Sequence, residues 1–265
     1  MSSNLTLRDE IRDYWSDRAL GFDAQPGHAI GSPSERAAWR ALLGRHLDGQ
    51  GAALDLACGT GEMSALLDDM GYSVTALDWS EPMLAIARAK AVAAGRRIAF
   101  RQADAEATME PEASYDVLFT RHLVWTLVDP AAAFADWLRV LRPSGRLVIV
   151  DGDFVTRGRA ARWLDRVERR LGLARPPADL ALAERHRAIL SRVYFRDGAR
   201  AGAVAALLVQ AGFSDIRIDR RLGPINRAIG RSAGWREMLR REAQHRYLIV
   251  ARRPLISGPS TQLET

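Results

Sequence analysis

Apolar residues recur along the chain with two different periods, and the alternation of these periods predicts an α/β fold. Short apolar runs of strand length lie between segments whose apolar residues are three and four positions apart, a spacing typical of helices. The seven predicted strands are 52–57, 73–78, 98–104, 115–120, 146–153, 214–220 and 245–253. The helices predicted among the first five strands are 62–70, 81–95 and 130–145. Strands that alternate with helices through short connections indicate a doubly wound, mostly parallel sheet.

Helical patterns dominate the two ends of the chain. Before the first strand, helices are predicted at 5–20 and 34–47, the second with Ser34 as its N-cap. The helices predicted after the fifth strand are 157–173, 178–194 and 200–212, with a further helical insertion at 222–244. The last two strands flank this insertion and suit an antiparallel C-terminal edge of the sheet.

These patterns divide the chain into five parts. The parts are an N-terminal helical cap (1–50), a core (51–153), a helical insertion (154–199), the C-terminal part of the sheet (200–254, with the insertion 222–244) and a tail (255–265). The tail contains too few apolar residues to pack, so we expect it to be disordered.

Composition narrows the class of protein. The chain has 265 residues, of which 48% are hydrophobic, enough to bury a core as one domain. Its one cysteine is Cys58, so a disulfide framework is excluded and a cytoplasmic setting is expected. No apolar run reaches the roughly 18–20 residues of a membrane span. The charged residues near the N-terminus are unlike a signal peptide.

Charge is distributed unevenly along the chain. Up to Asp151 there are 15 basic and 21 acidic side chains, whereas the remainder has 23 basic and 11 acidic ones, for a net charge of +6. This arginine-rich composition is compatible with solvated helix faces. It is equally compatible with an anionic substrate, a nucleic acid or a membrane surface that meets the C-terminal half. Charge alone leaves these alternatives open.

The stretch ALDLACGTGEMSALL, residues 53–67, places a glycine turn between a predicted strand and a predicted helix. A dinucleotide-binding turn requires a third glycine, or an alanine, where Ser64 stands. A Walker loop for phosphates requires a lysine, which is absent here. The turn therefore fits poorly with either phosphate ligand.

The same stretch resembles the first motif of class I S-adenosylmethionine-dependent methyltransferases, an acidic residue followed by x-x-Cys/Gly-Gly-x-Gly. VTALDWSEPML resembles the second motif, FRQADAE the third, and residues 115–153 the fourth and fifth, in the family's order and spacing. YWSDRALGFD and LRVLRPSGRLVIVD are similar to the small-molecule branch, methyltransferase type 11, that contains quinone-biosynthesis enzymes. The resemblance implies a Rossmann-like fold with helical cap insertions. In it, 51–153 would bind the donor and 154–199 would cover the substrate.

The resemblance assigns the donor site to the carboxyl ends of the first three strands. Gly59 and Gly61 let the backbone approach a ligand, and the helix that they open directs N–H groups toward a carboxylate. Asp78 is expected to accept hydrogen bonds from ribose hydroxyls, and Asp104 one from the adenine amino group. The expected S-adenosylmethionine-binding residues are Tyr14, Asp55, Ala57, Cys58, Gly59, Gly61, Met63, Asp78, Trp79, Met83, Asp104, Ala105 and Arg121. No metal is expected.

Several of these residues also have plain structural interpretations. Asp55 is equally suited to hold the loop through hydrogen bonds, and Met83 to fill the core. Nothing near Cys58 in the sequence activates a thiolate, so this side chain is expected to pack as a small thiol. Tyr14 is suited either to cover the donor or to staple its own helix.

The residues after the fourth strand bear on the methyl acceptor. FTRHLVW stands where amino-methylating DNA and protein enzymes have Asn/Asp-Pro-Pro-Tyr. A single cysteine cannot supply the thiols of RNA cytosine or arsenic methylation. We therefore expect a small-molecule partner, with an anionic one among the alternatives, and no nucleic acid. Its pocket is expected between the N-terminal helix, the loop after the fourth strand, and the insertions 157–194 and 222–244.

Four side chains are candidates for contact with the acceptor: Trp15, His28, His122 and Trp125. His122 follows the fourth strand directly and is the candidate general base, with a pKa expected near the working pH. Arg121 is suited to bind either the carboxylate of the donor or an anionic acceptor.

The predicted function is transfer of a methyl group from S-adenosylmethionine, with S-adenosylhomocysteine as product, to an oxygen or nitrogen atom of a small metabolite. The protein is expected to act as a monomer or homodimer. One alternative is a C-methyltransferase of quinone biosynthesis at a membrane surface. Another is an S-adenosylmethionine-binding protein without transfer activity.

Overall fold

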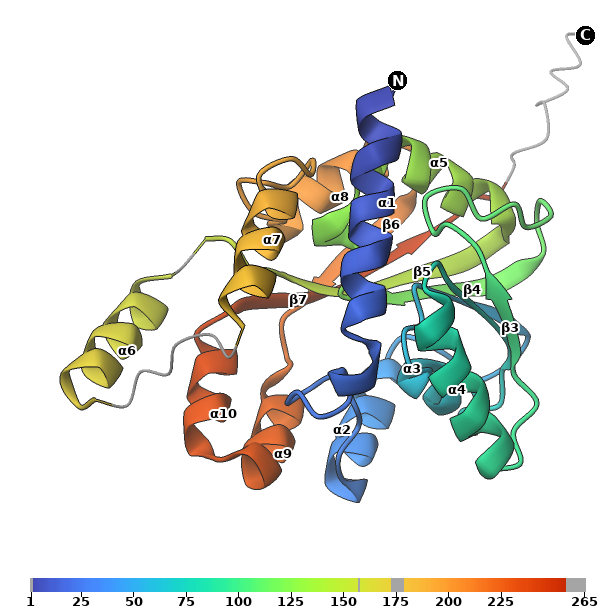
Figure 1. Ribbon diagram of the computed structural model, residues 1–265. Coiled ribbons are helices and arrows are strands. Elements are labelled where there is room, and N and C mark those ends of the chain that lie inside the picture. Colours follow the sequence, from blue (N-terminus) through green and yellow to red (C-terminus); the bar gives the residue numbers. More distant parts are fainter. Residues whose placement is uncertain (1, 157, 173–178, 256–265) are drawn as a thin grey trace, which may run out of the picture.

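The computed structural model describes residues 2–156, 158–172 and 179–255, and a seven-stranded sheet forms the centre of this part of the chain (Figure 1). The strand order is β3-β2-β1-β4-β5-β7-β6. The strands are β1 (Ala52–Leu56), β2 (Ser73–Asp78), β3 (Ala99–Gln102), β4 (Tyr115–Arg121), β5 (Leu141–Asp153), β6 (Ser214–Asp219) and β7 (His245–Arg252). β1 to β5 pair in parallel, and β7 pairs antiparallel with both β5 and β6. The predicted mostly parallel sheet with an antiparallel pair at its C-terminal edge is confirmed.

Helices precede, connect and follow these strands. The α-helices are α1 (Ser2–Asp17), α2 (Pro33–Leu43), α3 (Glu62–Asp69), α4 (Glu81–Ala93), α5 (Pro130–Val140), α6 (Arg159–Arg170), α7 (Leu180–Leu190), α8 (Ala201–Gln210), α9 (Gly223–Ala233) and α10 (Trp235–Glu242). Two short 3-10 helices, η1 (Ala19–Gly21) and η2 (Val124–Thr126), follow α1 and β4. None of the described helices is long and apolar enough to cross a membrane.

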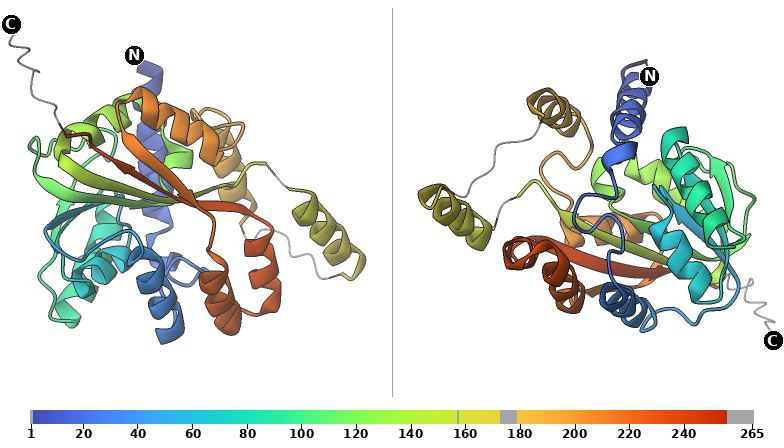
Figure 2. Two further views of the ribbon diagram at one scale, coloured as in Figure 1. Left: turned by 180° about the vertical axis from the view of Figure 1, so that it is seen from behind. Right: turned by 60° about the horizontal axis from the view of Figure 1, so that its bottom comes forward.

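Helices cover both faces of the sheet, as Figure 1 and Figure 2 show from several sides. On one face α5 and α8 pack against the strands, with Phe134 and Trp137 fully buried. On the other face α2, α3 and α9 pack through residues such as Leu43 and Leu66. Full burial of a large apolar side chain contributes about 1.5–3 kcal/mol, so these two layers hold the strand ends in fixed positions.

The helices α1 and α7 lie side by side over the carboxyl ends of the parallel strands (Figure 1). Leu7 and Tyr14 of α1 form an apolar cluster with Ile189 and Val193 from the end of α7 and the residues after it. The hydroxyl of Tyr14 lies 2.6 Å from Nδ1 of His186. These contacts make α1 and α7 a roof above the strand ends.

The predicted start of α2 and the predicted end of α5 are among the boundaries that are wrong. The N-cap of α2 is Ser32, whose hydroxyl accepts a hydrogen bond from the Glu35 N–H at 3.1 Å. Pro33 occupies the first helical position, which places the cap one residue before it. The predicted helix 130–145 ends at Val140, and Leu141 already pairs with Tyr115 as β5 begins.

The early start of β5 has a local cause. Pro143 cannot continue a helix, and it disfavours the helical conformation of the residue before it. Two predictions concern other parts of the chain: the break between the helices 157–173 and 178–194, and the disordered tail at 255–265. Both lie outside the described residues, apart from their outermost positions.

Candidate functional site

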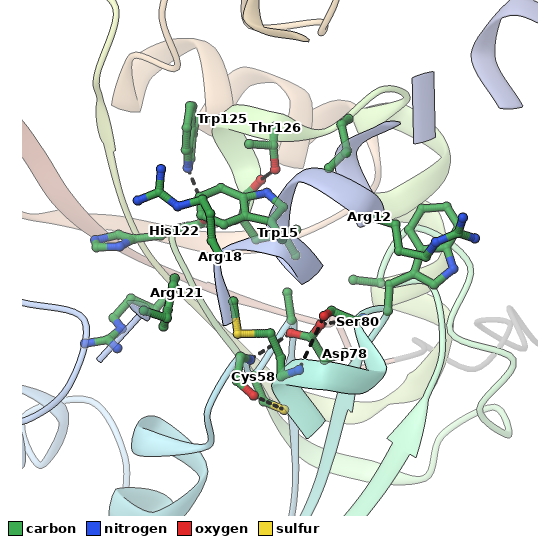
Figure 3. Close-up of a pocket in the computed structure, with 18 of the residues that line it drawn as sticks. Arg12, Trp15, Arg18, Cys58, Asp78, Ser80, Arg121, His122, Trp125 and Thr126 are labelled. Atoms are coloured by element: carbon green, nitrogen blue, oxygen red, sulfur yellow. Dashed lines mark hydrogen bonds between the residues drawn. The ribbon is translucent and has the colours of Figure 1, made fainter. Parts of the chain in front are cut away.

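A cavity of about 400 Å³ opens at the carboxyl ends of β1, β2 and β4, beneath the roof of α1 and α7. This volume is in the range of small-molecule sites. The residues predicted from the sequence that line it are Trp15, His28, Asp55, Ala57, Cys58, Gly59, Met63, Asp78, Trp79, Met83, Asp104, Ala105, Arg121, His122 and Trp125. Tyr14 and Gly61 do not line it. In Figure 3, Asp78 and Ser80 lie on one side of the pocket and Arg121 and His122 on the other.

The glycine turn after β1 has an unusual backbone. Ala57, Gly59 and Gly61 all have left-handed conformations, with φ of 55°, 56° and 81°. Gly61 is the N-cap of α3, and a Cβ added there would lie 3.1 Å from the Cβ of Ala87 in α4. Gly61 therefore shapes the turn from outside the cavity. A left-handed alanine stores strain of the kind found at functional sites.

The side chain of Asp55 stabilises the glycine turn. The carboxylate is buried and accepts a hydrogen bond from the Ser64 hydroxyl at 2.5 Å. Burial raises the pKa of Asp55 to about 7. Burial also raises the pKa of the neighbouring Cys58 thiol well above its usual value, with Asp78 adding to the effect, so Cys58 stays a neutral thiol.

Asp78, at the end of β2, faces the cavity with its carboxylate already oriented. One oxygen accepts from the Gly59 N–H at 2.7 Å and the other from the Ser80 N–H at 2.8 Å. Burial raises the pKa of Asp78 to about 6. A carboxylate has about four acceptor positions, so two remain for a ligand with hydroxyl donors.

Asp104 follows β3 and is held by the roof. Arg8 of α1 lies 3.3 Å from one oxygen of Asp104 and 2.8 Å from Glu106. The other Asp104 oxygen accepts from the Glu106 N–H at 2.8 Å. Arg8 therefore ties α1 to the β3 edge of the cavity.

Arg121, at the end of β4, is half-buried. Its Nη2 donates to the backbone oxygen of His28 at 2.5 Å, and its Nη1 has no hydrogen-bond partner. Burial lowers the pKa of Arg121, partly offset by the charge of Asp55. Burial lowers the pKa of His28 to about 3, and Arg121 adds to this shift. His28 is therefore neutral beside a fixed positive charge.

The prediction that the pKa of His122 lies near the working pH is wrong. Burial, followed by the charge of Arg246, lowers that pKa well below its usual value. Nε2 of His122 lies 3.2 Å from Nη1 of Arg246. Because a guanidinium can only donate, this nitrogen is the acceptor and is not free to take a proton from a substrate. The backbone of His122 is left-handed, with φ of 63°, another sign of strain at the site.

Sequence reasoning missed several residues that the fold brings to the cavity. They are Arg8, Arg18, Phe22, Phe154, His186 and Arg246. His186 stacks on Trp125 with ring centroids 5.5 Å apart. The Arg18 guanidinium donates to the Tyr14 hydroxyl at 2.7 Å, which leaves the Tyr14 proton for Nδ1 of His186. No sequence pattern marks His186 or Arg246, since each reaches the site only through tertiary packing.

The expected contribution of the insertion 222–244 to the pocket is also wrong. None of its residues lines the cavity, whereas His186 and Leu190 of the first insertion do. Arg241 lies behind the cavity wall and donates to the Pro26 backbone oxygen at 3.2 Å. The second insertion is instead joined to α2 through the packing of α9.

Comparison with known proteins agrees with this geometry. Residues 54–149 match the family model described as a methyltransferase domain. The matched segment contains the last three residues of β1, all of β2 to β4 and the first nine residues of β5. This match confirms the resemblance to class I S-adenosylmethionine-dependent methyltransferases.

Curated relatives match the same part of the chain. A demethylmenaquinone methyltransferase of Thermus thermophilus is 39% identical over 100 residues, which are 37% of this chain and 46% of the relative. A malonyl-[acyl-carrier protein] O-methyltransferase of Serratia marcescens is 35% identical over 123 residues, 44% of this chain and 47% of the relative. The chain spans about half the length of these relatives.

Solved structures share the fold over most of the chain. A phosphoethanolamine N-methyltransferase 2 of Haemonchus contortus, in complex with phosphomonomethylethanolamine and S-adenosylhomocysteine, aligns with a TM-score of 0.62 at 17% identity. The alignment covers 92% of this chain and 60% of that protein. At this identity the likeness concerns the fold alone. The acceptors named for these three proteins differ from one another.

Proposed function

We propose, on the premise that residues 54–149 form a class I methyltransferase domain, that this chain binds S-adenosylmethionine and methylates a small molecule at oxygen or nitrogen. One observation carries the proposal: the glycine turn, Asp78 and Asp104 follow three adjacent strands and line one cavity. Ligands of open α/β sheets bind at this edge. The helical insertion 154–199, which contributes His186, would cover the acceptor.

The polar groups of the cavity fit the parts of such a donor. Asp78 has acceptor positions left for the two ribose hydroxyls, and Asp104 with the Ala105 N–H suits the adenine edge. The N-terminus of α3 suits the carboxylate of the methionine part. Trp79 and Met83 line the cavity near Asp78, where they would flank the adenine ring.

S-adenosylmethionine supplies an electrophilic methyl group, which reacts by in-line displacement. The contribution of the chain is then to hold donor and acceptor in line and to exclude water. Trp15, Trp125 and Phe154 line the cavity and provide an apolar wall for this purpose. The ring of Trp125 is fixed by a hydrogen bond from its Nε1 to the His122 backbone oxygen at 2.9 Å.

The histidines of the cavity favour an acceptor that reacts without a strong base. Nε2 of His122 accepts from Arg246, and Nδ1 of His186 accepts from Tyr14. Burial holds the pKa of His28 at about 3. An amine lone pair or an oxygen that is already ionised suits such a site better than a neutral alcohol does.

A second candidate is C-methylation of a quinone precursor at a membrane surface. It is supported by the relative from Thermus thermophilus, whose name specifies demethylmenaquinone. Flotation with anionic lipid vesicles at physiological salt distinguishes the two proposals. The protein should stay out of the vesicle fraction if its substrate is a free small molecule, and co-float if it works at the membrane.

Replacement of Asp78 tests the donor site. Asp78→Ala removes hydrogen bonds to a charged acceptor, each worth about 1.5–3 kcal/mol, so S-adenosylhomocysteine should bind roughly tenfold or more weakly in calorimetry. Because the carboxylate form accepts the ribose hydroxyls, wild-type affinity should also fall as the pH decreases through about 6. This decline should be much smaller in the variant.

The matched control is Asp197→Ala. Asp197 is an exposed aspartate outside the cavity, with a side chain that is 96% accessible. Its replacement changes the net charge in the same way and should leave the affinity unchanged. Equal affinity of the wild type and Asp78→Ala would contradict the ribose assignment.

A further inference from the structure

Two half-buried arginines, Arg121 and Arg246, line the cavity without a carboxylate partner. Arg121 bonds to one backbone oxygen and leaves Nη1 without a partner. Arg246 donates from Nε to the side chain of Gln244 at 2.8 Å and from Nη1 to His122 at 3.2 Å. Within the described part of the chain, neither guanidinium lies within ion-pair distance of an acidic side chain. Buried charges of this kind are costly unless a partner compensates them.

The surroundings of the pair contain both positive and negative charge. Arg241 is 4% exposed and forms an ion pair with Glu237 at 3.4 Å. Burial, followed by the charge of Arg241, lowers the pKa of Arg246 to about 9, and the charge of Asp151 partly offsets this shift. Nδ1 of His28 is buried without a partner. Arg121 Nη1 and His28 Nδ1 are therefore two polar atoms beside the cavity whose hydrogen-bonding capacity is unused.

The position of Arg246 separates it from the donor. Arg246 pairs with Gly152 of β5, and β4 and β5 lie between β7 and β1 in the sheet. Three strand spacings of about 4.8 Å each place β7 about 14 Å from the glycine turn of β1. The Arg246 backbone is therefore well separated from a carboxylate bound at that turn. Arg121, on β4 next to β1, lies between the two positions.

Aromatic rings border the same region. The Arg246 guanidinium lies 5.2 Å from the centre of the Phe154 ring. Phe154 contacts Trp125, with ring centroids 5.4 Å apart. An acceptor at this position would meet an apolar wall on one side and two guanidinium groups on the other.

We propose that the methyl acceptor is an organic anion with an apolar body, whose carboxylate or phosphate group is bound by Arg246 and Arg121. The proposal rests on the proposed methyltransferase function and specifies its substrate class. The planar guanidinium groups match the oxygen pairs of carboxylates and phosphates. The body of the acceptor packs against Trp125 and Phe154. If the atom that receives the methyl group is an oxygen that is already ionised, the reaction needs no general base.

Calorimetry with simple probes tests this subsite. Benzoate and phenyl phosphate present the two anionic groups on an apolar ring, and benzyl alcohol is the neutral counterpart. With S-adenosylhomocysteine bound, the wild type should bind at least one of the two anions more tightly than the alcohol. Arg246→Gln should weaken that binding about tenfold or more and leave the affinity for S-adenosylhomocysteine unchanged.

Thermal unfolding distinguishes a ligand-binding role from a structural one. Removal of a half-buried cation that has no ion-pair partner should raise the Tm of Arg246→Gln in the absence of anions, whereas loss of a structural arginine would lower it. Phenyl phosphate or benzoate should raise the Tm of the wild type, relative to sodium chloride at equal ionic strength, and not that of the variant. Arg97→Gln is the control, because Arg97 is exposed, lies outside the cavity and carries the same charge.

The outcomes separate the two proposals. The subsite is contradicted if both anions bind no better than benzyl alcohol, if Arg246→Gln binds them as the wild type does, or if its Tm falls. These titrations are also run without S-adenosylhomocysteine. Failure of S-adenosylhomocysteine to bind would overturn the proposed function, while the anion titrations still decide the subsite.

Discussion

At the scale of single residues, the site combines buried carboxyl groups on one side with buried cations on the other. Burial raises the pKa of Asp55 to about 7 and of Asp78 to about 6, whereas it lowers the pKa of His28 and Arg246. The raised pKa of the carboxyl groups and the lowered pKa of His28 and Arg246 both favour the neutral form of the group, as expected for groups removed from water. Such perturbed groups cluster at functional sites. A donor that supplies hydroxyl groups and an acceptor that supplies negative charge would satisfy the two sides.

His122 provides a prediction at this scale. We expect it to position Arg246 through Nε2, so His122→Asn should retain most of the turnover, because asparagine tolerates a left-handed backbone and can accept a hydrogen bond. His122→Ala should raise KM for the acceptor. Steady-state kinetics over pH 6–9 measure both effects, with donor affinity as the control.

A general-base role for His122 predicts a different pattern. Both replacements would then lower kcat by roughly 10²-fold or more, and the acidic limb of the pH profile, which reports protonation of the base, would differ from that of the wild type. A loss of that size in His122→Asn would restore the interpretation that the sequence suggested.

At the scale of elements, the glycine turn and α3 depend on close contact with α4. Gly61 combines a left-handed backbone with a position where a Cβ would lie 3.1 Å from that of Ala87. The sequence motif predicts this turn and the two aspartates after β2 and β3, because strand ends and turn residues are local features. The motif does not predict that Ser32 caps α2 or that β5 begins at Leu141. Those boundaries depend on proline positions and on strand pairing.

Replacement of Gly61 by alanine tests the contact. Gly61→Ala should lower the free energy of unfolding by roughly 2–3 kcal/mol, since the left-handed conformation and the overpacking each cost about 1 kcal/mol or more. Gly95→Ala is the control, because Gly95 is also left-handed but has open space around it. Urea unfolding should show a clearly smaller loss for Gly95→Ala. Equal losses would mean that packing against α4 contributes nothing.

At the scale of the whole molecule, the sheet assembles a site from segments that are far apart in sequence. Arg246 meets His122 across 124 positions, and His186 meets Tyr14 across 172. The alternation of apolar periods predicts the strands and most helices. The pairing of β7 with β5, and the packing of α7 on α1, arise only when the chain is folded. The sequence therefore predicts the cavity residues near β1 and β2 more completely than those from α7 and β7.

The proposed function is tested most directly by a search for methyl transfer itself. The measurement is incubation with methyl-labelled S-adenosylmethionine and a small-molecule cell extract, followed by separation of labelled products. We expect a labelled small molecule, S-adenosylhomocysteine released in equal amount, and a marked decrease of both in Asp78→Ala at subsaturating donor. If the protein binds the donor but yields no labelled product with any extract fraction, it is a binding protein. If the wild type neither binds the donor nor transfers its methyl group, the proposed function is wrong.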